Sequence, residues 1–389
     1  MRGRPWLPAL AWGAAAAASA QTNDHLFRSW AWPPAPVTAR ALGLAGAGVA
    51  LPDDAGSALA SPANLVTLVK TEASVAVRRR GAGELRLGDT VAGGTDLAFI
   101  GVAGRISGRW ALAGYLAETR SADLRLAPRP LPDGLSDEGE LSVTVLESGL
   151  SAGWTLVPGL DVGLRLAAAR LSADGEYRRE APSQPTLMRV EVGGTQTRLV
   201  GSLGAAWVPG RGFRLAVAYH EGGTFSLERR AVSPFLGAVL DEGSTFALRQ
   251  PGAFSAGASA RLGRKVLLLA QVDRVRYGEV QAVLSIRQGA HARGDYRLPD
   301  AWEPAAGIEV SLPFSRVSAQ FRAGLRGTGP AALSYQGGDA AEAASFPASE
   351  RQLGWGLGAS VVSAAVRLDV AVAGVEGPQA LVASLARRF

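Results

Sequence analysis

Residues 316–326 read Arg-Val-Ser-Ala-Gln-Phe-Arg-Ala-Gly-Leu-Arg, and polar and apolar side chains alternate along this stretch. Val317, Phe321 and Leu325 fall at odd positions, whereas the arginines and the glutamine fall at even ones. Because successive side chains of a β-strand point to opposite faces, the alternation predicts a strand with one apolar and one polar face. Such a strand suits a wall that separates lipid from a polar interior.

Segments with the same period of two recur through the chain, for example at 212–220, 353–361 and 366–372. We count fourteen segments that can form strands, an even number, as single-chain bacterial outer-membrane barrels have. Most of them reach the ~9–11 residues that a tilted strand needs to cross a bilayer. The predicted strands are 72–80, 95–104, 109–120, 140–157, 160–176, 194–208, 212–228, 244–262, 265–288, 300–312, 316–327, 350–362, 365–373 and 380–389.

Short and long gaps alternate between the predicted strands. Short turns at one rim and long loops at the other are typical of an up-and-down barrel that spans an outer membrane. The expected fold is therefore all-β, a 14-stranded antiparallel transmembrane β-barrel, with both ends of the mature chain at the rim of the short turns. The short gaps lie at 107–108, 158–159, 209–211, 263–264, 313–315 and 363–364, and the long gaps at 81–94, 121–139, 177–193, 229–243, 289–299, 328–349 and 374–379.

The composition agrees with a barrel. Of the 389 residues, 47% are hydrophobic and only 19% are charged, against about 25% charged in soluble proteins. After residue 20 no stretch stays apolar for the ~18 residues that a membrane helix needs. The absence of cysteine excludes disulfides, thiolate metal sites and a lipidated N-terminal cysteine. A soluble all-β protein rich in alanine and glycine is the competing class.

The net charge of +6 comes almost entirely from arginine. No basic cluster is interleaved with aromatic residues, so binding of nucleic acid is not expected. The basic runs 78–80 and 229–230 lie where strands meet long gaps, and guanidinium groups there would face the phosphates of lipopolysaccharide. Solvated strand ends explain the same runs equally well.

Residues 1–20 have the pattern of an export signal. Arg2 and Arg4 precede an apolar stretch, and Ala18-Ser19-Ala20 fits a cleavage site, so the mature chain is expected to begin after residue 20. A retained membrane anchor is the alternative, but the apolar stretch is too short for one.

Two features at the strand ends fit a barrel in an outer membrane. Aromatic residues cluster beside the short turns, as in the girdle at a membrane–water boundary. Phe389 ends an alternating segment and resembles the C-terminal signal by which barrels are recognised for assembly, although Arg387 departs from that pattern. The clustered aromatics are Trp110, Trp154, Trp207, Phe213 and Phe314.

Glycine and alanine dominate residues 39–65, between the export signal and the first strand. A phosphate-binding loop is one way to read such a run. The spacing of Gly43, Gly46 and Gly48 does not match G-x-G-x-x-G, and no βαβ unit surrounds it. Nucleotide binding is therefore not expected.

The same run passes through Asp53-Asp54 and then Ser61-Pro62-Ala63. In this it resembles the N-terminal hatch of FadL-type outer-membrane transporters for long-chain fatty acids and aromatic hydrocarbons, where Asn usually stands in place of Ser61. The segments 251–257, 268–277 and 321–326 are also similar to that family.

The resemblance implies a barrel of fourteen strands, formed by residues 71–389, whose lumen is plugged by residues 21–70. It also implies that hydrophobic substrates leave sideways through a gap in the wall, in the outer membrane of a Gram-negative-type bacterium, without a cofactor. The related barrels of type IX protein secretion share the N-terminal pattern. A secretion-associated or scaffolding barrel that binds protein cargo is therefore the alternative.

Catalysis and metal binding are not expected from this sequence. His25, His220 and His291 are the three histidines, and none has a serine and an acid at a recognisable spacing. Their own spacing suits no metal site. A satisfied or solvated histidine is the preferred interpretation of each.

Charged residues whose register points them into the lumen are candidate ligand contacts. An inward arginine would bind the carboxylate of a fatty acid as a bidentate pair. A network of ion pairs that fills the barrel is the favoured interpretation of any single residue. The candidates are Arg165, Asp273, Arg322, Arg326 and Arg367, with Gln271 and Asp369 as inward neighbours.

Overall fold

The computed structural model describes residues 36–130, 135–180, 186–283, 293–329, 332–348, 350–374 and 379–389. The predicted export signal lies outside these residues, and so do His25 and His291. Within the described part of the chain, no helix is long and apolar enough to cross a membrane.

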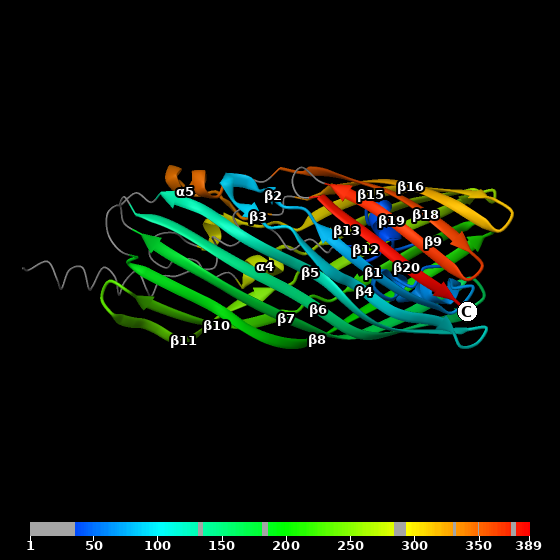
Figure 1. Ribbon diagram of the computed structural model, residues 1–389, viewed down its shortest axis with the longest axis horizontal. Helices are drawn as coiled ribbons and strands as arrows, with labels where there is room; N and C mark the ends of the chain where they lie inside the picture. Colours follow the sequence, from blue (N-terminus) through cyan, green and yellow to red (C-terminus); the bar gives the residue numbers. More distant parts are fainter. Residues whose placement is uncertain are drawn as a thin grey trace, which may run out of the picture.

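Fourteen antiparallel strands form a closed barrel, as predicted (Figure 1). Successive strands of the barrel are neighbours in the wall, and the first pairs with the last, with Val75 opposite Leu385. The strands are β1 (Glu72–Arg80), β4 (Gly94–Arg105), β5 (Trp110–Pro130), β6 (Ser136–Val157), β7 (Leu160–Glu180), β8 (Met188–Gly210), β9 (Phe213–His220), β12 (Ala253–Leu262), β13 (Val266–Val275), β15 (Ala301–Pro313), β16 (Val317–Thr328), β18 (Gln352–Ser363), β19 (Val366–Gly374) and β20 (Gln379–Arg388).

The two rims differ as the loop pattern predicts. Six tight turns join strand pairs at one rim, at the positions expected from the sequence. The C-terminus lies at this end, on the right in Figure 1. The described parts of the longer connections lie at the opposite rim.

Two predicted strands are wrong as single strands. The segment 212–228 is divided into β9 and β10 (Thr224–Ser233), and 244–262 into β11 (Ala238–Arg249) and β12. Both breaks contain glycine, and a Cβ added at Gly222 would lie only 1.9 Å from the carbonyl oxygen of Gln250. The breaks thus bring two backbones into direct contact. Beyond them, the β10–β11 hairpin extends the wall above the barrel.

Three predicted long gaps are mostly strand. β5 and β6 extend into 121–139, β7 and β8 extend into 177–193, and β10 and β11 extend into 229–243. The strands continue because hydrogen bonding between them continues and because apolar side chains such as Leu124, Leu126 and Val190 still face a buried interior. The wall is therefore taller on this side, as Figure 1 shows.

A cap of short elements covers part of the long-loop end. The predicted strand 265–288 ends early, at Val275, where the chain turns into α4 (Gly278–Ala282). Tyr277, Tyr296 and Phe346 are almost completely buried there and explain why the strand gives way to a packed cap. The other short elements at this end are β2 (Gly83–Glu84), η3 (Arg86–Gly88), β3 (Thr90–Val91), η4 (Arg293–Asp295), β14 (Tyr296–Arg297), β17 (Ser334–Tyr335) and α5 (Ala340–Ser345).

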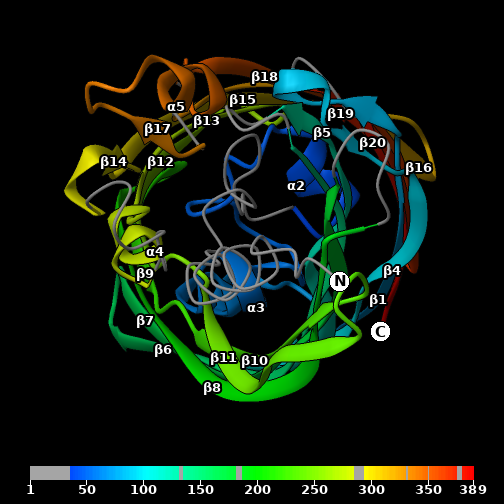
Figure 2. The ribbon, with the colours of Figure 1, turned by 90° about the vertical axis from the view of Figure 1, so that its left-hand side faces the viewer.

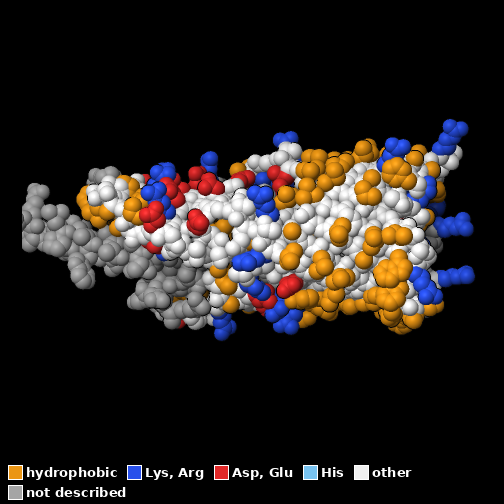
Figure 3. Space-filling view, turned by 90° about the horizontal axis from the view of Figure 1, so that it is seen from below, with side chains coloured by type: hydrophobic (Ala, Val, Ile, Leu, Met, Phe, Trp, Pro, Cys, Tyr) orange, Lys and Arg blue, Asp and Glu red, His pale blue; other side chains and the backbone are white. Residues whose placement is uncertain are grey.

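The outer surface carries an apolar band. On β16, the outward Phe321 is 51% exposed, whereas the inward Arg322 is 3% exposed, as the alternation predicts. In Figure 3 hydrophobic side chains cover the half of the wall nearer the short turns, and charged side chains gather beyond it. Trp110 and Trp154 stack near the short turns with ring centroids 5.0 Å apart. This surface fits a wall that faces lipid.

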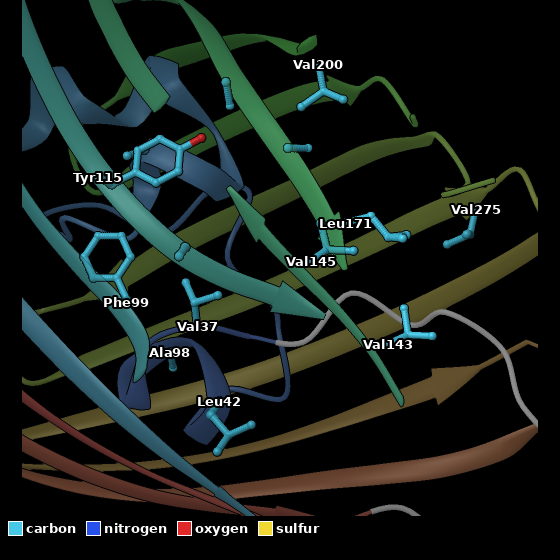
Figure 4. Packing of buried hydrophobic residues seen from close by; sticks show 14 of the residues in the cluster. Val37, Leu42, Ala98, Phe99, Tyr115, Val143, Val145, Leu171, Val200 and Val275 are labelled. Carbon is cyan, nitrogen blue, oxygen red and sulfur yellow. The ribbon is translucent and has the colours of Figure 1, made fainter. Parts of the chain in front are cut away.

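Residues 36–68, which precede β1, lie inside the barrel (Figure 2). We call residues 36–68 the hatch. It contains α2 (Ala39–Gly43), α3 (Ser57–Ala60) and η2 (Pro62–Thr67). Helices this short are not stable in isolation, so the hatch depends on the wall for its structure. In Figure 4, Val37 and Leu42 of the hatch lie in the same interior as Phe99 and Tyr115 of the wall.

Candidate functional site

The backbone of the hatch lies directly against the inner wall, because the wall carries glycine where the two meet. A Cβ added at Gly163 of β7 would lie 2.3 Å from the backbone nitrogen of Ala63. One added at Gly356 of β18 would lie 2.2 Å from the carbonyl oxygen of Leu42. No side chain fits in such a space, so the hatch is seated without clearance. Similar contacts with the hatch backbone occur at Gly153 and Gly324.

Buried ion pairs also join the hatch to the wall. Arg40 of α2 binds Glu309 of β15 through two hydrogen bonds, of 2.8 and 2.9 Å. Glu309 in turn accepts from Arg322 Nε at 2.6 Å, and Arg322 Nη1 lies 2.9 Å from Asp369 Oδ1. Asp369 pairs with Arg367 at 2.9 Å. The network therefore runs from the hatch through β15, β16 and β19 of the wall.

Arg40 remains charged inside the lumen. Burial by itself lowers the pKa of its guanidinium. The carboxylates of Glu309 and Asp54 raise it, and their effect is larger, so the pKa is above the ordinary value for arginine. The acidic partners thus hold the Arg40 guanidinium in its charged form.

Asp53 and Asp54 of the predicted hatch motif have different roles. Asp53 adopts a positive φ of 53°, and its Oδ2 atom lies 3.3 Å from Nη2 of Arg388 near the rim of the short turns. Asp54 is buried, and its Oδ1 atom accepts a hydrogen bond from the backbone nitrogen of Gly56 at 2.7 Å. Its Oδ2 atom lies 3.6 Å from Arg367. Both residues shape the turn and connect it to the wall.

Ser61, Pro62 and Ala63 lie where η2 meets the wall. Ser61 is completely buried, and its hydroxyl has no hydrogen-bond partner among the described residues. Pro62 is the first residue of η2, a position that requires no donor. The carbonyl of Ala63 accepts from Arg214 Nη2 at 3.3 Å.

Asn64 and Arg214 were not identified from the sequence. Arg214 Nε donates to Oδ1 of Asn64 at 2.8 Å, and Asn64 Nδ2 donates to the carbonyl of Val49 at 2.7 Å. Arg214 also pairs with Asp161 at 2.9 Å. The inward register of Arg214 was visible in its alternating segment, but the hatch atoms that it meets were not.

The five candidate ligand contacts all point into the barrel, and each has a partner of opposite charge. Arg165 lies 2.6 Å from Glu147, and Arg326 lies 2.8 Å from Asp273 and 2.7 Å from Glu303. Arg322 and Arg367 belong to the network described above. This arrangement agrees with a network of ion pairs, and a direct role for any of these residues in binding a ligand stays a prediction.

His220 connects the wall to α3. Its Nε2 atom lies 3.1 Å from the carbonyl oxygen of Ala60, and its Nδ1 atom lies 2.8 Å from the hydroxyl of Ser202. The partners of its two nitrogens are thus a carbonyl and a hydroxyl, so the ring holds the hatch in place. Among the described residues no group of three or more His, Asp or Glu side chains could hold a metal ion.

A cavity of about 240 Å³ lies between the hatch and the wall. The hatch contributes mainly apolar side chains such as Val49, Leu51 and Leu59. The wall contributes polar ones, among them Glu221 and Gln250 at the two strand breaks. One apolar side and a few polar groups are typical of sites for small organic molecules.

The ladder of hydrogen bonds in the wall is interrupted between β4 and β5. The two strands pair from the short turn as far as Phe99 and Ala117 and then separate. Residues 94–98 of β4 continue beside β1 alone, and β3 pairs with β5 farther from the turn. We call the interruption between 94–98 and 118–122 the side window; β3, β4 and β5 lie on the near side in Figure 1.

Solved structures of other barrels have a similar fold. A Pseudomonas aeruginosa FadL homologue matches with a TM-score of 0.67 and 15% identity, over 93% of this chain and 100% of that one. The Ralstonia pickettii toluene transporter TbuX matches with a TM-score of 0.61 and 13% identity, over 93% and 99%. The P. putida toluene transporter TodX matches with a TM-score of 0.62 and 11% identity, over the same shares.

Sequence comparison adds nothing to these matches. No family model matches the sequence, and no curated protein matches it. The similarity therefore lies in the closed barrel of fourteen strands, and it covers nearly the whole of each structure compared. The chain has the fold of the FadL-type barrels.

Proposed function

We propose that the chain is a passive outer-membrane channel for small hydrophobic molecules, which enter at the long-loop end and leave sideways into the bilayer. The observation that carries the proposal is the combination of a seated hatch and a side window. The hatch blocks the straight path toward the short turns. The side window lies in the wall, where a molecule in the lumen can reach lipid.

A sideways path suits an apolar cargo for a thermodynamic reason. Each buried CH₂ group contributes about 0.8 kcal/mol when it moves from water into an apolar medium. A hydrophobic molecule that leaves through the wall into lipid is stabilised by this amount for each CH₂ group. One that crosses a water-filled pore stays in water and is not stabilised. The mixed apolar and polar lining of the cavity supports a hydrophobic ligand between the hatch and the wall.

The names of the similar structures support this class of cargo. Two of the three named above are toluene transporters, and a further match is a monoaromatic hydrocarbon channel. These names favour transport of small molecules over the handling of protein cargo and over an enzymatic role. They also support a location in the outer membrane of a Gram-negative-type bacterium.

Uptake into vesicles tests the proposal. The full chain, reconstituted in liposomes, should accelerate entry of a labelled long-chain fatty acid or of toluene over protein-free liposomes. A labelled sugar of similar size is the control solute, and it should enter at the protein-free rate while the hatch is present. A variant that lacks the hatch, residues 36–68, should admit the sugar. If the intact chain accelerates neither apolar solute, the proposed function is wrong.

A further inference from the structure

Two arginines of β1 cross the inner side of β4 at the side window. Nη2 of Arg78 lies 2.7 Å from Oε1 of Glu118 on β5. Nη2 of Arg80 lies 3.2 Å from Oδ2 of Asp123 on β5, and its Nε atom lies 2.7 Å from Oδ2 of Asp96 on β4. β1 and β5 are not neighbours, because β4 runs between them. These ion pairs therefore span the part of the wall that has no β4–β5 hydrogen bonds.

Arg78 is enclosed but only partly satisfied. Its side chain is 3% exposed, and that of Glu118 is 13% exposed. Its Nε and Nη1 atoms have no hydrogen-bond partner among the described residues. Buried donors without a partner weaken the state that contains them. Glu118 is thus the nearest acidic partner of Arg78, and two donors of the guanidinium stay unsatisfied by any described residue while the window is closed.

Both strands that flank the side window are irregular at this level. The register between β1 and β4 shifts at Ala76 and Val77, and the register between β5 and β6 shifts between Glu118 and Arg120. An extra residue in a strand bends it and redirects the side chains beside it. Glu118 stands at the start of the second bulge and pairs with Arg78. The ion pair thus lies at an irregularity of the wall.

Apolar groups lie on both sides of the ion pairs. Phe99 and Tyr115 stack inside the barrel at the edge of the side window, with ring centroids 6.4 Å apart. Leu97 and Ile100 of β4 are exposed on the outer surface. An apolar molecule therefore meets aromatic rings on the inside, two ion pairs in the wall, and aliphatic side chains on the outside.

We propose that the Arg78–Glu118 and Arg80–Asp123 pairs form an ionic latch that closes the side window, and that an uncharged apolar molecule passes when Arg78 and Glu118 separate. The inference rests on the proposed function. Two side chains can separate and rejoin while the neighbouring strands stay paired. To open a continuously paired part of the wall, several backbone hydrogen bonds would have to break. Arg78 and Glu118 are thus positioning residues that control passage.

A reversible crosslink tests the latch, and the natural lack of cysteine makes it simple. Arg78→Cys and Glu118→Cys are combined, and the purified chain in liposomes is treated with a reducible bis-methanethiosulfonate. Entry of the uncharged dye N-phenyl-1-naphthylamine should stop when the crosslink forms and return when a reductant cleaves it. Unchanged entry in the crosslinked sample overturns the latch. The single-cysteine variants, treated identically, control for modification alone.

Glu118→Gln tests the charge without a large change in shape. Entry of the dye should rise by about tenfold, the change that a loss of ~1.4 kcal/mol in closing free energy produces. Reversal of the pair by R78E with E118R should return entry toward the rate of the unaltered chain. Asp137→Asn is the matched control, because the Arg179–Asp137 pair is also largely buried but joins β6 and β7, which are continuously paired.

The two proposals fail in different ways. If the unaltered chain admits no dye, the channel function itself is wrong. If the unaltered chain admits dye and E118Q behaves like Asp137→Asn, the channel stands and the latch is wrong. A shift in gel mobility on heating reports whether each variant is folded before its rate is compared.

Discussion

Arg40 of the hatch and Glu309 of β15 form a bidentate ion pair between the hatch and the wall, with N–O distances of 2.8 and 2.9 Å. The two side chains are 6% and 5% exposed. Removal of one partner from a buried pair leaves an uncompensated charge and costs about 3–5 kcal/mol. The hatch is therefore bound to the wall by an interaction that water does not readily replace.

Glu309→Gln should loosen the hatch, because both Arg40 and Arg322 lose their shared carboxylate. We expect the free energy of unfolding to fall by about 3 kcal/mol and ion conductance through single channels in a planar bilayer to rise. Arg230→Gln is the control, since the ion pairs of Arg230 are long and its side chain is 52% exposed. Equal conductance of the two variants would show that this ion pair does not hold the plug.

Gly163→Val should displace η2 from the wall. A valine side chain cannot occupy a space in which even a Cβ would lie 2.3 Å from the Ala63 nitrogen. Overpacking of this kind costs about 1–3 kcal/mol. The temperature at which the heated protein loses its folded gel mobility should fall. Gly108→Val lies in a short turn with nothing within 4 Å, and its transition temperature should stay that of the unaltered chain.

Leu164→Arg tests whether the apolar band faces lipid. Leu164 points outward from β7, and arginine on the lipid face of a barrel costs about 2–4 kcal/mol at mid-bilayer. Folding into liposomes, followed by denaturant titration, should show that loss. Leu236→Arg also replaces an apolar side chain with a charged one, but Leu236 lies in the β10–β11 turn, beyond the band. A similar loss in both variants contradicts the assignment of the band.

Gly222→Ala tests the break between β9 and β10. The added methyl would overlap the carbonyl oxygen of Gln250, 1.9 Å away, so the two breaks should move apart. Hydrogen exchange of the amides at 221–223 and 250–252 should accelerate. Gly210→Ala, where nothing lies within 4 Å, should leave these amides unchanged. Slow exchange in Gly222→Ala would mean that the contact is not essential to the break.

Some of this structure could be predicted because it depends on local patterns. The segment 316–327 became β16, with Phe321 outward and Arg322 inward, since alternation along a strand decides which face a side chain joins. The six short turns also occur where expected, because glycine, proline and serine mark them. The count of fourteen strands is correct, although two of the segments are broken.

Local patterns thus settle the strands, their faces and the alternation of short and long loops. Which inward groups meet depends on the three-dimensional fold: Arg40 and Glu309 are 269 residues apart, and their contact depends on the relative shift of distant strands. The close approach at Gly222 and the side window with Arg78 and Glu118 have the same origin. Alternation predicts which face of the wall a side chain joins, but the register and closure of the barrel decide which residues it contacts there.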